Sequence, residues 1–185
     1  MKRLRQGILR AAIAALISSA AIGAAAAQES PAPLDPHVLV ITLSSTLIGE
    51  PEVQSAGGTD IVRFSVEGTA GGDIEGSFEA RVTRVGEGAA RAFNPPNFSL
   101  PASALLTLTG VEGTIEIALD GVVFFPETGF PDAVTRMSGR VMSVGGVFAD
   151  LFLADAIYEG RIDIEEIEAA QRPLAETATL TLVPR

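Results

Sequence analysis

The chain has 185 residues and no cysteine, and its 13 Lys and Arg against 23 Asp and Glu give a net charge of −10. Without cysteine it can form neither disulfides nor metal–thiolate sites. A chain this acidic lacks the clustered basic residues that bind nucleic acid or an anionic membrane surface, so we predict neither partner.

The N-terminus has the pattern of a secretory signal peptide. Four Lys and Arg residues among the first ten precede an apolar run over Ala11–Ala27, which ends in small residues. We predict that residues 1–27 are removed after Ala27 and that the protein is periplasmic or secreted; an alanine-rich signal of this kind is typical of bacteria. The 17-residue run is shorter than a membrane span of about 20, so no stable membrane insertion is predicted. The mature chain would have a net charge of −14, with nine Lys and Arg against 23 acids.

Residues 28–36 are polar and rich in proline, which predicts a flexible linker before a domain over 37–185. In that domain apolar and polar residues alternate with a period of two, which predicts strands with one buried face. Asp120–Gly121 is a turn-forming dipeptide and is predicted to separate two strands. The predicted strands are Leu39–Leu43, Val62–Glu67, Ile74–Thr83, Leu106–Leu108, Thr114–Leu119, Val122–Phe125, Val134–Val144, Val147–Leu153, Ile157–Ile164 and Thr177–Val183.

Eight to ten short strands with scarcely any helix predict an all-β fold. A single antiparallel β-barrel of about eight strands is favoured over the alternative, a β-sandwich. The inward positions mix large and small residues, as where Phe78 lies between Gly76 and Ala80, and this suits a tapered interior. Closure of the sheet would also remove exposed strand edges.

Phenylalanines gather in or beside two long connections, 86–103 and 126–133. They either plug an end of the barrel or surround the mouth of an apolar cavity, because ligand pockets are concave and mainly apolar. On the second interpretation the predicted ligand-binding residues are Phe64, Phe78, Phe148 and Tyr158 in the interior and Phe93, Phe98 and Phe130 at the mouth.

Polar anchors for such a ligand are predicted at Tyr158 and Asp150. Asp150 stands among Phe148, Leu151 and Phe152, and burial there would raise the pKa of its carboxyl. No catalytic residue can be assigned, since the mature chain has no Lys or Cys and its one histidine, His37, lies at the start of the first strand.

No cofactor or metal is predicted. The glycines punctuate strands and do not lie between a strand and a long helix, which excludes a nucleotide-binding loop of the usual kind. Acidic oxygens are plentiful, but no D-x-D-x-D-G calcium loop is present.

Two segments resemble a known family. Val144–Ala149 followed by Ala156–Gly160 is similar to the "GG-x-G-x-F-x-x-A-x-G" strand pair of the allene oxide cyclase-like and dirigent-like barrels, and Gly71–Phe78 is similar to their "G-D-L-x-G-x-F" strand. The resemblance implies an eight-stranded barrel with a central apolar cavity, often in a trimer. Plant members steer the cyclisation or coupling of hydrophobic intermediates by confining them, and this needs few catalytic side chains.

Three functions follow from these observations. The first is an exported barrel that binds a small hydrophobic molecule, with or without a cyclase- or isomerase-like activity. The second is a non-catalytic structural or interaction module of the cell envelope, for which an exposed apolar patch near Phe124–Phe130 would be evidence. The third is a hydrolase centred on His37.

Overall fold

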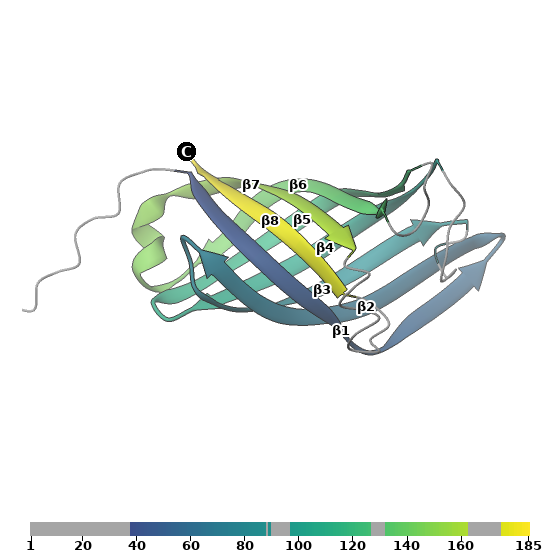
Figure 1. Cartoon of the computed structure of the whole chain (residues 1–185), viewed down its shortest axis with the longest axis horizontal. Coiled ribbons are helices and arrows are strands. Elements are labelled where there is room, and N and C mark those ends of the chain that lie inside the picture. The colour runs from purple at the N-terminus through teal and green to yellow at the C-terminus, as the bar shows by residue number, and fades with distance from the viewer. Residues whose placement is uncertain (1–37, 88, 90–96, 127–131, 163–174) are drawn as a thin grey trace, which may run out of the picture. The chain divides into compact units, whose positions relative to one another are not determined.

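The computed structural model describes residues 38–87, 89, 97–126, 132–162 and 175–185. They form a closed antiparallel barrel of eight strands, in which each strand pairs with the next along the chain and β8 pairs with β1 (Figure 1). The predicted all-β barrel is therefore confirmed. The strands are β1 (Leu39–Ala56), β2 (Thr59–Gly72), β3 (Gly76–Gly86), β4 (Phe98–Gly110), β5 (Gly113–Phe125), β6 (Val134–Val144), β7 (Leu153–Ile162) and β8 (Ala175–Pro184).

The segment predicted as a strand over Val147–Leu153 is instead a short 3-10 helix, η2 (Gly146–Leu151). Its buried residues, Phe148 and Leu151, are three apart and so lie on one side of a 3-10 turn. Gly146 (φ 71°) and Phe152 (φ 49°) flank the turn in left-handed conformations that a strand does not contain. The first half of the family-like strand pair therefore leads into a helix.

The turn predicted at Asp120–Gly121 is not formed either, because β5 runs without a break through both residues. A side chain at Gly121 would collide with the main-chain oxygen of Arg136 on β6. The glycine thus allows close approach of two neighbouring strands, which is the alternative reason for a glycine inside a strand.

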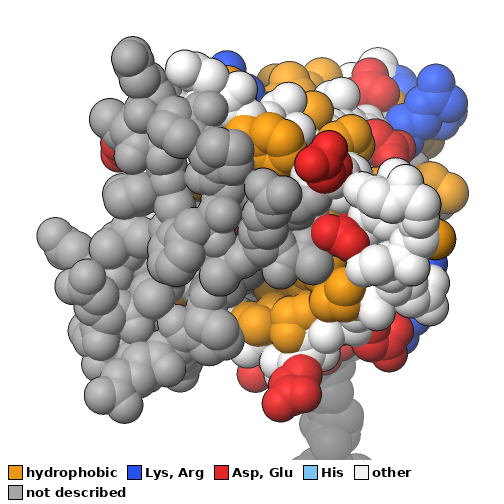
Figure 2. Space-filling view, turned by 90° about the vertical axis from the view of Figure 1, so that its right-hand side faces the viewer, with side chains coloured by type: hydrophobic (Ala, Val, Ile, Leu, Met, Phe, Trp, Pro, Cys, Tyr) orange, Lys and Arg blue, Asp and Glu red, His pale blue; other side chains and the backbone are white. Residues whose placement is uncertain are grey.

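The two ends of the barrel differ in their connections. At one end, called the turn end, short connections follow β2 and β4, and η2 links β6 to β7. At the other, called the loop end, a two-residue turn joins β1 to β2, while longer connections follow β3, β5 and β7. Figure 2 shows the loop end, where hydrophobic side chains lie among acidic and uncharged ones.

The core of the turn end is apolar and fully enclosed. Several inward residues have no exposed surface, and Phe148 and Leu151 of η2 are buried with them. The carbon Cζ of Phe148 would lie 3.5 Å from a Cβ at Gly110, which places this ring beside the β4–β5 turn. The residues of this core with 0% exposure are Ile41, Leu108, Ile115, Ile117, Leu180 and Leu182.

The predicted signal peptide 1–27, the linker 28–36 and His37 all lie outside the described residues. Within the described part of the chain, no helix has both the length and the hydrophobicity that crossing a membrane requires.

Candidate functional site

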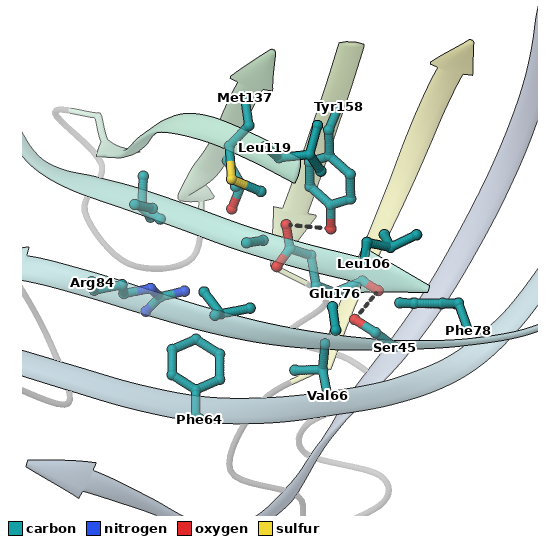
Figure 3. Close-up of a pocket in the computed structure, with 16 residues that line it drawn as sticks. Ser45, Phe64, Val66, Phe78, Arg84, Leu106, Leu119, Met137, Tyr158 and Glu176 are labelled. Carbon is teal, nitrogen blue, oxygen red and sulfur yellow. Dashed lines mark hydrogen bonds between the residues drawn. The ribbon is translucent and has the colours of Figure 1, made fainter. Parts of the chain in front are cut away.

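A cavity of about 30 Å³ lies inside the barrel, toward the loop end (Figure 3). One water molecule needs roughly 10–15 Å³ of such space, so the cavity has room for about two. Its apolar wall consists of Phe64, Val66, Phe78, Ala80, Val82, Ala102, Ala104, Leu106, Leu119, Val123 and Met137, and its polar residues are Ser45, Arg84, Thr135, Tyr158 and Glu176.

Glu176 is the centre of the polar group. It is the second residue of β8, and its side chain points inward, where only 8% of the residue is exposed. The Tyr158 hydroxyl on β7 donates a hydrogen bond to Glu176 Oε1 at 3.3 Å, and Ser45 Oγ on β1 donates to the Glu176 main-chain oxygen at 3.3 Å. Figure 3 shows the Glu176 carboxyl between Tyr158 and Arg84.

Burial raises the pKa of the Glu176 carboxyl, because removal from water penalises the charged form. The Thr135 hydroxyl, the Arg84 charge and the Tyr158 hydroxyl oppose this by stabilising the carboxylate. Burial likewise raises the pKa of the Tyr158 phenol well above its usual value, and the neighbouring Glu176 adds to this. The pair is therefore biased toward its protonated, neutral form.

Gly160 makes room for this carboxyl. It lies on β7 two residues after Tyr158, paired with Ala178 of β8. A Cβ atom at Gly160 would collide with Glu176 Oε1 and would lie 3.0 Å from Cε1 of Tyr158. The absence of a side chain at this one position thus allows Glu176 to be held against Tyr158.

Arg84 brings a positive charge to the same cavity. Its side chain is only partly covered, but its Nε atom is buried and has no hydrogen-bond partner among the described residues. The guanidinium carbon lies 5.0 Å from the centre of the Phe64 ring, a cation–π contact. Burial lowers the pKa of Arg84, and Glu176 and Tyr158 partly offset this.

Small residues on the neighbouring strand leave space for the arginine. Arg84 on β3 is paired with Ala102 of β4, and Val82 with Ala104. Both alanines line the cavity and are buried. These two small side chains therefore leave room inside the barrel for the long side chain of Arg84.

Three of the predicted ligand-binding residues come together here, namely Phe64, Phe78 and Tyr158. Phe98 is half-buried and packs against Phe125, with 6.4 Å between ring centres, and does not line the cavity. Phe93 and Phe130 lie outside the described residues.

Phe148 and Asp150 are placed differently from the prediction. Phe148 is interior, but it fills the turn end and is not part of the cavity. Asp150 is exposed in η2, so it is not the buried anchor that its apolar neighbours suggested. The 3-10 turn explains the difference, because it buries Phe148 and Leu151 and directs the two residues between them, Ala149 and Asp150, to solvent.

Sequence reasoning missed Arg84 and Glu176, yet their positions carry a signal. Each continues the inward series of its strand: Arg84 follows Phe78, Ala80 and Val82 at intervals of two. Glu176 precedes Ala178, Leu180 and Leu182 in the same way. A charged residue in phase with buried neighbours indicates a buried charge.

The site therefore combines a guanidinium with an unused donor, a carboxyl that readily holds a proton, a phenol and an apolar wall. It can bind an anionic or hydrogen-bond-accepting group and can exchange a proton at Glu176. Among the described residues, no group of three His, Asp or Glu side chains is arranged to hold a metal ion. No family model, curated protein or solved structure matches the chain.

Proposed function

We propose that the protein is exported and that its barrel binds a small, mainly apolar molecule that carries one polar group. The observation that supports this best is the interior of the loop end, where an apolar wall surrounds Arg84, Tyr158 and Glu176. Burial of such groups costs free energy. Apolar side chains at these three positions would make the barrel at least as stable. Specific ligand pockets have this composition.

The size of the cavity limits how the ligand enters. Drug-sized ligands occupy roughly 300–1,000 Å³, whereas the free space here is about 30 Å³. A ligand larger than two water molecules must displace side chains that line the cavity. Met137 is suited to this, because an unbranched thioether side chain repacks readily.

Binding alone does not make the barrel an enzyme, and a cyclase- or isomerase-like reaction would need reactive groups in addition to a binding site. Such a reaction would require a proton donor or acceptor in contact with the ligand, and Glu176 and Tyr158 are the cavity residues that offer one. The remaining acceleration would come from holding the ligand in one conformation.

Native mass spectrometry of the protein purified from its own cells tests the proposal. We expect a mass excess of one small molecule that disappears on denaturation. Ala104→Leu, which fills the cavity, should lose it. Ala118→Leu, a change on the outer, half-buried side of β5, should keep it. A protein that carries no molecule and also takes up none from a lipid extract of those cells would contradict the proposal.

An interaction module is the second candidate, and one feature of the outer surface favours it. Pro101 of β4 is paired with Val122 of β5, and both are exposed beside Phe124, which is 40% exposed. A photo-crosslinking residue in place of Phe124 should capture a partner or a second copy, as in the trimer that the family resemblance implies. The same residue in place of Glu79, on the outer face of β3, is the control. Equal capture at the two positions would contradict an interface at Phe124.

A further inference from the structure

We infer that the ligand of the barrel is a monocarboxylate, a single carboxylate group on an apolar tail, and that Arg84 binds the carboxylate. This inference rests on the proposed function, because it names the class of ligand for the same cavity.

Arg84 has a hydrogen-bond donor left unused by the described residues. The Nε–H group of Arg84 is buried at the cavity and meets no acceptor in the described residues. A buried donor without a partner is unfavourable because its hydration is lost and not replaced, so an acceptor supplied by a ligand would be bound favourably. The planar guanidinium presents two parallel N–H groups, which fit the two oxygens of a carboxylate.

The charged residues of the cavity match a ligand with a single negative charge. Arg84 is the one cation that lines the cavity and Glu176 the one acid, counting the residues that the structure describes. Burial raises the pKa of Glu176, which favours the neutral acid beside Arg84. When Glu176 holds its proton, the site carries the one positive charge of Arg84 and is matched by one negative charge. A phosphate ester with a second charge would be left uncompensated.

The size of the cavity and its apolar wall also fit a carboxylate on an apolar tail. The free space equals about two water molecules, and the two oxygens of a carboxylate occupy a similar volume. Beyond it the wall is apolar, with Phe64 under the guanidinium and Met137 and Leu119 on the opposite side (Figure 3). An apolar tail would contact these side chains, whereas a polar tail would lose its hydration without compensation.

Calorimetric titration of the full chain with hexanoate, hexanol and hexanamide tests the inference, because the three probes share the tail and differ in the head group. We expect hexanoate to bind roughly 10- to 100-fold more tightly than the other two, as charge-assisted hydrogen bonds require. Arg84→Met should remove this preference. Arg81→Met, on the same strand but exposed, should leave it intact.

Arg84→Met is also made together with Glu176→Gln, because replacing both members of a buried charged pair is often neutral, whereas removing one member alone is destabilising. Glu176→Gln gives a second variant that keeps the shape of the neutral acid and should retain the preference for hexanoate. Equal affinity for all three probes would overturn the carboxylate inference and leave the proposed function standing. No binding of any probe would count against both.

Discussion

The interior of this barrel is built in two ways, although the same eight strands run through both ends. At the turn end, Leu108 and Ile115 are paired across β4 and β5 and have no exposed surface, and η2 adds Phe148. At the loop end, inward-facing positions of β3, β7 and β8 carry Arg84, Tyr158 and Glu176 around a cavity. Burial of apolar side chains stabilises the turn end, whereas burial of charged and polar groups at the loop end costs free energy.

Two leucines on β4 give the sharpest form of this comparison and the largest expected effect. Leu106 lines the cavity, whereas Leu108, two residues further on, lies in the closed core. Leu108→Ala should lower the free energy of unfolding by about 3–5 kcal/mol, because it opens a new cavity. Leu106→Ala should cost about 2 kcal/mol less, since it enlarges an existing cavity whose polar residues allow water to enter. Denaturant unfolding measures both, and equal losses would mean that the two ends do not differ.

A smaller effect is expected at Gly160. Gly160→Ala would push the Glu176 carboxyl away from Tyr158, and overpacking of this kind costs about 1–3 kcal/mol. Combining it with Glu176→Ala should recover much of the loss, because the colliding atoms are gone. A double-mutant cycle measures the coupling; strictly additive losses would show that Gly160 does not position Glu176.

The raised pKa of Glu176 predicts a pH dependence of stability. The folded protein keeps this proton at pH values where the unfolded chain has lost it, above the ordinary value of 4.5. The contribution of Glu176 is therefore greatest below that value and is lost as the pH rises through the folded pKa. Glu176→Gln should abolish this part of the pH profile, and Glu79→Gln, on the outer surface, should not. If Glu176→Gln had the same pH profile of stability as the unchanged protein, the pKa of Glu176 would not be raised in the folded state.

The smallest effect is expected for Tyr158→Phe, which removes only the hydroxyl that donates to Glu176. A loss of about 0.5–1.5 kcal/mol is expected. The pKa of Glu176 should also rise further, because this hydrogen bond stabilises its carboxylate. Carbon-detected NMR of the Glu176 carboxyl would measure the shift, and a fall in its pKa would contradict the assigned contact.

The period-two pattern was sufficient to predict an all-β fold, because alternation over long strands leaves one buried face whatever the loops do. Preferring a barrel to a sandwich also needed the mixed sizes of the inward residues. It was not sufficient around Gly145–Gly146 and Asp120–Gly121. There a glycine can mark a turn, a close approach of strands or the start of a 3-10 helix, and only the neighbouring strand decides which.

The site was predictable in part. The apolar liners Phe64 and Phe78 follow from their strand phase, as does Tyr158. Arg84 and Glu176 lie in phase too, but each is one residue outside its predicted strand, Ile74–Thr83 or Thr177–Val183, where a charge is normally solvated. That they face the same cavity depends on ring closure, since β3 and β8 are far apart in the sequence and do not pair.

We propose above all that the loop end is a binding site and that the turn end is a core. Amide NMR spectra of the full chain during addition of hexanoate test this most directly. We predict that the shifted signals cluster at Ser45, Arg84, Tyr158 and Glu176 and that Leu108, Ile115 and Phe148 stay unchanged. Shifts confined to the turn end, or spread evenly over the barrel, would contradict the claim.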